Sequence, residues 1–214
     1  MVQTWPIARA GMVIGLLGGS FDPAHAGHAH ITREALKRLR LDRVWWLVTP
    51  ANPIKARVPA PMTQRIAQAQ AVINHPKVVV TDIESYLRGS ATRKKAPHTT
   101  VQTMQSLRRH YPKVTFVWLM GADNLEQFNK WDRWQSIMST TLIGVFARSS
   151  AGPNVRLSLA ARRFGQAQVR AGGDLVSRKP AAWQFFNLPM IPLSSSDIRA
   201  AGKWRSNTHT LKNK

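Results

Sequence analysis

Six short apolar runs, separated by amphipathic stretches, determine the fold class of this 214-residue chain. Each run is continuously apolar instead of alternating with polar residues, which is typical of strands buried on both faces of a parallel sheet. The expected strands are residues 13–17, 44–49, 78–81, 114–120, 142–147 and 183–186.

Helical patterns fill the intervals between these runs. Apolar residues recur at helical spacing within 28–39, 63–73 and 100–107, and Thr99 or Thr100 is a candidate N-cap for the last of these. Strand–helix–strand alternation at this spacing predicts βαβ units with right-handed crossovers. We therefore expect an α/β fold with a Rossmann-like open, mostly parallel sheet and helices on both faces. It would form a single domain over residues 1–214, with flexible termini at 1–11 and 204–214.

The charge balance is strongly basic, with 31 Lys and Arg residues against 10 Asp and Glu residues and a formal net charge of +21. Such a balance attracts polyanions, but it is equally compatible with a basic surface that serves no partner. The sequence has no cysteine, which excludes disulfides and cysteine nucleophiles. The longest apolar run near the N-terminus, 12–17, is too short for a membrane span or a secretory signal. We expect a cytoplasmic protein with no membrane partner.

The segment between the first expected strand and the first expected helix reads GGSFDPAHAGH, residues 18–28. Gly18 and Gly19 lack a Cβ atom, so the backbone can approach a phosphate there, where open α/β sheets bind their ligands. His25 and His28 are three residues apart, which lets both imidazoles face one side of the helix terminus. Each ring can donate an N–H to a phosphate, and a protonated ring also neutralises charge. The alternatives are a tight turn with incidental histidines, or a zinc site that lacks a third ligand nearby.

A second candidate phosphate segment, SSSDIR, lies near the C-terminus at residues 194–199. The hydroxyl groups of Ser194, Ser195 and Ser196 can cap a short helix and can also donate to a phosphate. The planar guanidinium of Arg199 suits two phosphate oxygens. Taken alone, the segment favours a capped helix with a surface arginine, but beside the histidine turn it favours a second phosphate-binding element.

The first of these segments resembles the G-x-F-x-P-x-H-x-G-H signature of the HxGH nucleotidyltransferase superfamily, and the whole chain resembles its bacterial nicotinate-nucleotide adenylyltransferases. The SSSDIR segment is similar to the I-S-S-T-x-I-R motif of that family, with Leu193 in place of the isoleucine. The resemblance implies transfer of AMP from ATP to nicotinate mononucleotide, which gives deamido-NAD and pyrophosphate. It implies that His25, His28 and Arg199 are catalytic. The implied ATP site consists of Gly18, Gly19, Ser20, Phe21, His25, His28, Ser194, Ser195, Ser196 and Arg199.

Two further segments look like the parts of this family that bind the mononucleotide. Residues 49–55 resemble its P-x-x-N-P-x-K stretch, and residues 116–134 resemble its G-x-D…W region. In the implied site Asp123, at the end of the fourth strand, accepts hydrogen bonds from a ribose, and Trp131 stacks on the pyridine ring. Without the resemblance, Trp131 would be interpreted as a packing residue. The implied nicotinate-mononucleotide site consists of Asn52, Lys55, Thr100, Gly121, Asp123 and Trp131.

One stretch departs from the family pattern. The family has Ser-Tyr-Thr before the third long helix, whereas this chain has His98-Thr99-Thr100, and Gln102 replaces an acidic residue. The departure concerns the shape of the nicotinate pocket and leaves the ATP end unaffected.

The implied chemistry needs charge neutralisation more than a base. The attacking phosphate monoester is largely ionised at neutral pH, so no general base is required. The expected donors and cations are His25, His28, Lys55 and Arg199, with Mg²⁺ bound mainly through substrate phosphates and no protein ligand to a metal.

Two alternative functions stay open at this point. One is another HxGH-type nucleotidyltransferase, with nicotinamide mononucleotide or phosphopantetheine as the acceptor. The other is a basic nucleic-acid-binding protein, which leaves both phosphate motifs unexplained. We expect ATP and nicotinate mononucleotide as partners and no specific nucleic acid, and the sequence leaves a homo-oligomer open.

Overall fold

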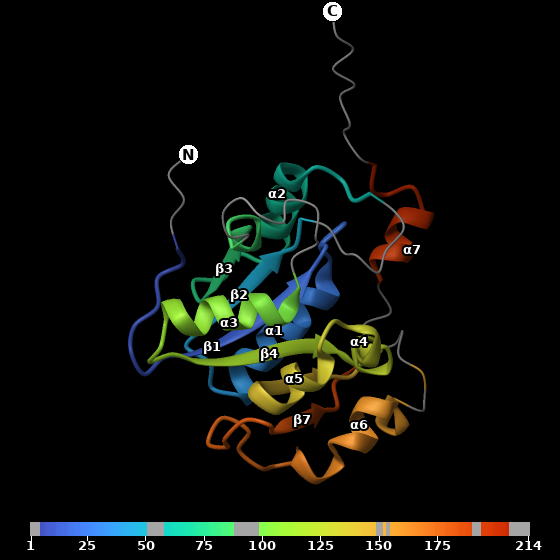
Figure 1. Cartoon of the computed structure of the whole chain (residues 1–214). Helices are drawn as coiled ribbons and strands as arrows, with labels where there is room; N and C mark the ends of the chain where they lie inside the picture. The colour runs from blue at the N-terminus through green and yellow to red at the C-terminus, as the bar shows by residue number, and fades with distance from the viewer. Residues whose placement is uncertain are drawn as a thin grey trace, which may run out of the picture.

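A computed structural model of the chain describes residues 5–50, 58–87, 99–148, 152, 155–189 and 194–205. The strands in this part form one seven-stranded sheet, and every neighbouring pair is parallel. The strand order is β3-β2-β1-β4-β5-β7-β6 (Figure 1). This sheet confirms the expected α/β, Rossmann-like fold. The strands are β1 (Val13–Gly19), β2 (Arg43–Val48), β3 (Val78–Thr81), β4 (Thr115–Gly121), β5 (Leu142–Phe146), β6 (Gln168–Val169) and β7 (Trp183–Phe186).

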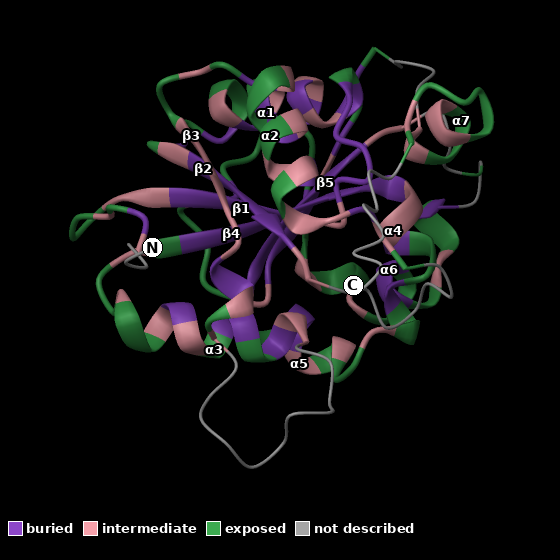
Figure 2. Cartoon of the chain, turned by 90° about the horizontal axis from the view of Figure 1, so that it is seen from above, coloured by how far each residue is buried: buried purple, intermediate pink, exposed green. Residues whose placement is uncertain are grey.

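Helices cover both faces of the sheet. Figure 2 shows α1 and α2 on one face and α3 and α5 on the other, with the buried strands between them. The helices are α1 (Ala26–Arg38), α2 (Met62–Val72), α3 (Thr100–His110), α4 (Ala122–Glu126), α5 (Trp134–Thr140), α6 (Leu159–Arg163) and α7 (Ser195–Ala200).

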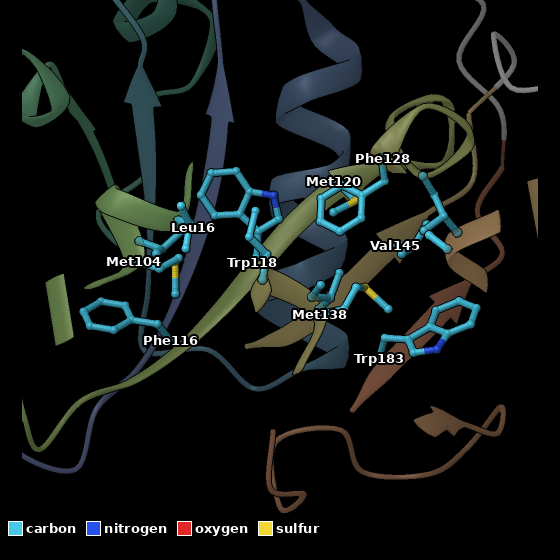
Figure 3. Close-up of a cluster of buried hydrophobic side chains, with 14 of the residues drawn as sticks. Leu16, Met104, Phe116, Trp118, Met120, Phe128, Met138, Val145 and Trp183 are labelled. Carbon is cyan, nitrogen blue, oxygen red and sulfur yellow. The ribbon is translucent and has the colours of Figure 1, made fainter. Parts of the chain in front are cut away.

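The continuous apolar runs are explained by two hydrophobic cores, one on each face of the sheet. Successive strand residues point to opposite faces, so Leu16 belongs to the core under α3 and α5, while Leu17 belongs to the core under α1 and α2. Trp45 and Trp46 divide in the same way. Figure 3 shows the first of these cores, with Trp118 of β4 between Leu16 on one side and Met120 and Phe128 on the other.

Several short elements were not expected from the sequence. These are α4, α5, α6 and β6, each with seven residues or fewer. Helices of five to seven residues make no more than two turns, which is too short to show a helical period, and the strand β6 has only two residues. No helix of the described residues is long and apolar enough to cross a bilayer.

Two residues of the expected flexible N-terminus, Trp5 and Pro6, contact the C-terminal end of α3 and the residue that follows it. The ring of Trp5 stacks on that of His110 with centroids 3.7 Å apart. The hydroxyl of Tyr111 donates to the carbonyl of Pro6 at 2.7 Å. The stacking of Trp5 on His110 of α3 therefore attaches the start of this segment to the rest of the protein.

The strand order reverses between β1 and β4, since the chain proceeds outward from β1 in one direction and from β4 in the other. In open parallel sheets such a switch point leaves a crevice beyond the carboxyl ends of the strands, where ligands bind. The segment after Gly19 and the segment after Gly121 therefore meet at this crevice.

Candidate active site

The first turn, residues 20–25, crosses the switch point between β1 and α1. Phe21 takes the left-handed backbone conformation, with φ of 47°, and is only 2% exposed. Its ring stacks on that of Trp46 at 4.9 Å and lies 4.9 Å from the ring of His28. Phe21 is thus a packing anchor beneath the histidines, which fixes the course of the turn.

The two glycines at the end of β1, just before this turn, have different surroundings. A Cβ atom at Gly18 would lie 2.6 Å from Cη2 of Trp118, so that space is filled by the protein's own core. A Cβ atom at Gly19 would meet its nearest neighbour, Cε2 of Phe21, at an ordinary 3.5 Å. A side chain at Gly18 is therefore excluded by the indole of Trp118, whereas a methyl group at Gly19 would meet only ordinary contacts. That both glycines open the backbone to a phosphate stays a prediction.

The backbone of the turn orients both histidine rings. The N–H of Gly27 donates to Nδ1 of His25 at 3.1 Å, and the N–H of His25 donates to Nδ1 of His28 at 3.3 Å, which together form a capping box at the start of α1. Because Nδ1 accepts in each case, the neutral ring carries its hydrogen on Nε2. The ring centroids lie 4.0 Å apart, so the two imidazoles are direct neighbours at the start of α1.

The structure favours one of the two roles that the sequence left open for His25, that of a neutral donor and not a cation. Burial and, to a lesser extent, the positive charge of Arg148 lower its pKa from 6.5 to about 4, while the carboxylate of Asp197 acts in the opposite direction. Desolvation disfavours the charged imidazolium, so the ring is neutral at pH 7. The burial and both charges come from segments distant in the chain, where a local motif carries no information about them.

Arg148 is the site residue that the sequence did not reveal. It follows β5, and its Nη2 lies 3.5 Å from Nε2 of His25 while its Nη1 lies 3.5 Å from Oδ2 of Asp123. Nε2 of the neutral His25 and the guanidinium both carry hydrogens, so together they offer N–H groups to an anion. A cation directly after an expected strand, at the edge where ligands bind, is the signal that could have identified it.

The second phosphate segment lies against the first turn. Ser194 is the N-cap of α7, and the hydroxyl of Ser195 donates to the carbonyl of Pro23 at 2.9 Å. The guanidinium of Arg199 donates to the carbonyl of Asp22 and to the hydroxyl of Ser196, the latter at 3.1 Å. The expected capped helix and the expected meeting with the histidine turn are both present.

A buried arginine, also missed from the sequence, ties the loops around the crevice together. Arg65 of α2 is 2% exposed, and its guanidinium donates to the carbonyls of Ser20 at 2.6 Å, Thr49 at 2.9 Å and Ala60 at 2.7 Å. Burial lowers its pKa, and the carboxylate of Asp22 raises it. Arg65 therefore fixes the ends of β1 and β2 relative to α2.

At the end of β4 the structure corrects one expected position. Asp123 does not end the strand: β4 ends at Gly121, which is the N-cap of α4, and Asp123 lies in the first helical turn. A Cβ atom at Gly121 would overlap Oδ1 of Asp123 and Cδ of Arg148, so the glycine allows this pair to lie across the strand end. Oδ1 of Asp123 is buried and has no hydrogen-bond partner among the described residues.

The structure describes two of the four remaining residues of the implied mononucleotide site, Trp131 and Thr100. Trp131 is half-buried, 6.2 Å from the ring of Trp118 and 5.0 Å from that of Phe128. Thr100 is the first residue of α3. Asn52 and Lys55 lie outside the described residues.

The departure from the family pattern has a structural role at the start of α3. Thr99, one of the two expected candidates, is the N-cap, and Oε1 of Gln102 accepts its N–H at 3.0 Å. One turn later the hydroxyl of Thr103 donates to the buried carboxyl of Glu84 at 2.7 Å. Burial raises the pKa of Glu84, while hydrogen bonds from Thr103 and Thr49 lower it, so this carboxyl joins α3 to the loop after β2.

Comparison with known proteins places this geometry among nucleotidyltransferases. The cytidylyltransferase-like family matches residues 16–201. A probable nicotinate-nucleotide adenylyltransferase of Cereibacter sphaeroides is 59% identical over 91% of this chain and 100% of its own length. That of Roseobacter denitrificans is 54% identical over 95% and 100%.

A solved structure shares the fold at much lower sequence identity. It is the Plasmodium falciparum nicotinic acid mononucleotide adenylyltransferase complexed with NaAD, which is 16% identical to this chain, with a TM-score of 0.65 over 88% of this chain and 83% of the other.

Proposed function

The chain belongs to the cytidylyltransferase-like family and, within it, to the nicotinate-nucleotide adenylyltransferases, and from this premise we propose that the crevice at the switch point transfers AMP from ATP to nicotinate mononucleotide. One observation supports this use of the site above all others. The paired histidine donors, Arg148 and the Arg199 segment come from three separate parts of the chain and meet over the same strand ends.

The proposed step is a single displacement at phosphorus. A phosphate oxygen of the mononucleotide forms a bond to the α-phosphorus of ATP, and the bond from that phosphorus to the bridging oxygen of the β-phosphate breaks. The electron pair leaves with pyrophosphate. The nucleophile is already ionised at neutral pH, so the protein has to hold two anions in line and stabilise the departing charge.

The described residues suit these tasks. The Nε2–H groups of His25 and His28 donate to phosphate oxygens, and the positive charge comes from Arg148 and Arg199. The buried, unpartnered Oδ1 of Asp123 suits a donor such as a ribose hydroxyl. We also assign Lys55 and Asn52 to the proposed mononucleotide site, where Lys55 would add positive charge near the phosphates.

Magnesium is part of the proposal as an ion carried by the substrate. No three His, Asp or Glu side chains within the described ranges form a metal site. A Mg²⁺ ion at this crevice would take its ligands mainly from phosphate oxygens and water, and it would neutralise phosphate charge there.

Product analysis tests the proposed function directly. The protein is incubated with ATP, Mg²⁺ and one acceptor at a time: nicotinate mononucleotide, nicotinamide mononucleotide or phosphopantetheine. We expect deamido-NAD and pyrophosphate in equal amounts with the first acceptor. A higher kcat/KM with either of the other acceptors would assign the alternative substrate.

The His28→Ala variant is the control for chemistry at this site. Loss of one preorganised donor reduces turnover by about 10²- to 10³-fold, while the fold, checked by circular dichroism, is expected to stay intact. Survival of a tenth or more of the activity would contradict the catalytic assignment of the histidine pair.

A further inference from the structure

The attachment of α7 to the rest of the protein is polar. None of its six residues, all within the described part of the chain, is buried. Figure 1 shows α7 apart from the helices that cover the sheet. Two hydrogen bonds already described, from Ser195 to Pro23 and from Arg199 to Asp22, connect it to the first turn. Hydrogen bonds, and not apolar packing, therefore decide where the Arg199 segment lies.

The chain beyond α7 returns to the same turn. Gly202 takes the left-handed conformation, with φ of 68°, and the N–H of Lys203 donates to the carbonyl of Ile198 at 3.1 Å, which reverses the chain. After the reversal, Trp204 contacts the first turn, where its indole Nε1 donates to Oδ1 of Asp22 at 2.7 Å.

The next residue adds a second contact with the body of the protein. The carbonyl of Arg205 accepts from Nε2 of Gln64 on α2 at 2.8 Å. The described part of the C-terminal segment, expected to be flexible, is thus held at both Trp204 and Arg205.

Asp22 is a rigid anchor for this contact. It is 6% exposed, its Oδ1 also accepts the N–H of Ala60 at 3.3 Å, and the charge of Arg65 faces it. It precedes Pro23 and lies three residues before His25, in the turn that carries the histidine pair. Trp204, which follows α7 in the chain, binds Asp22 and thereby fixes the distance between the two phosphate segments.

We propose that Trp204 is a positioning residue of the ATP site: its indole N–H, bound to Asp22, holds α7 so that Arg199 and the histidine pair engage the same triphosphate. Trp204 belongs to neither phosphate motif, and it acts through Asp22 without contacting the nucleotide. The inference rests on the proposed function in taking ATP as the ligand of these two segments.

The Trp204→Phe variant isolates the contact, because phenylalanine keeps an aromatic ring and removes the donor. The variant loses a hydrogen bond to a carboxylate, and this loss should destabilise the ATP complex more than the free enzyme. We therefore expect about a 10-fold weaker Kd and KM for ATP. The KM for nicotinate mononucleotide should stay within about 2-fold, since Trp204 lies at the ATP end. Trp5→Phe, the same substitution at a tryptophan that stacks on His110, is the matched control and should leave both constants unchanged.

A double-mutant cycle with Asp22→Ala tests whether the effect passes through the carboxylate. The Trp204→Phe change should weaken ATP binding in the native background and add nothing in the Asp22→Ala background. Equal losses in both backgrounds, or ATP binding by Trp204→Phe within 2-fold of the native protein, would overturn the proposal. If Asp22→Ala fails to fold, the contrast between the two substrates in Trp204→Phe alone decides.

The two proposals fail in different measurements. ATP binding, followed by calorimetry without any acceptor, tests the role of Trp204. Absence of transfer to nicotinate mononucleotide by the native protein would refute the proposed function and leave that binding result intact.

Discussion

The neutral state of His25 predicts an unusual dependence of stability on pH. The folded protein holds this ring at a pKa of about 4, against 6.5 for an ordinary histidine. As the pH falls through 6.5, the unfolded chain binds a proton that the folded chain does not bind until about pH 4. The unfolded state therefore binds more protons in this window, and the free energy of unfolding falls as the solution is acidified.

The magnitude follows from the separation of the two pKa values. Each pH unit between them is worth about 1.36 kcal/mol, so the full loss is roughly 3 kcal/mol, of which about 2 kcal/mol is lost between pH 7 and pH 5. The largest cause is burial of the ring, and the second is the guanidinium of Arg148.

The perturbation is His25→Asn, which keeps an N-cap acceptor for the N–H of Gly27 and removes the titrating group. Urea unfolding, followed by tryptophan fluorescence at pH 7, 6 and 5, gives the free energy of unfolding for both proteins. The native protein should lose about 2 kcal/mol more than the variant over this range, since the other titrating groups are common to both. His75→Asn, on the loop between α2 and β3, is the matched control for the substitution itself. Parallel curves for the native protein and His25→Asn would refute a buried, neutral His25.

Three further predictions concern Arg148 and the two glycines at the end of β1. Arg148→Met should lower kcat/KM by about 10²- to 10³-fold, because it removes a cation beside His25, and Arg148→Lys should recover part of that loss. Steady-state kinetics of the two variants test this prediction. Near-native activity of the methionine variant would contradict it. Gly18→Ala should lower the free energy of unfolding by about 1–3 kcal/mol, because its methyl group meets the buried ring of Trp118. Gly19→Ala should leave stability nearly unchanged and raise the KM for ATP about 10-fold, because its methyl group enters the space predicted for a phosphate. Urea unfolding and ATP kinetics of the two glycine variants separate these outcomes, and equal effects at both positions would show that the glycines are interchangeable.

Most of the sheet was predictable because its central strands are buried on both faces and separated by amphipathic helices. Runs such as 44–49 supply residues to two cores at once, which leaves a continuous apolar pattern in the sequence. The short elements around the site left no such pattern. The sequence did not reveal α4 because Gly121 is both the last residue of β4 and the N-cap of α4, so no loop separates the two elements. Asp123, expected at the strand end, therefore lies in a helical turn.

The sequence alone determined the fold class, the paired histidines after the first strand, and the serine and arginine segment near the C-terminus. These are local properties: the period of a pattern and the spacing within a motif survive without knowledge of what lies nearby. Only the tertiary structure decided the charge of the site. It made His25 neutral, placed Arg148 beside it across 123 residues of chain, and brought Trp204 to Asp22 across 182 residues. A pKa and a hydrogen bond depend on burial and on the nearest groups in space, and those are fixed only when distant segments pack together.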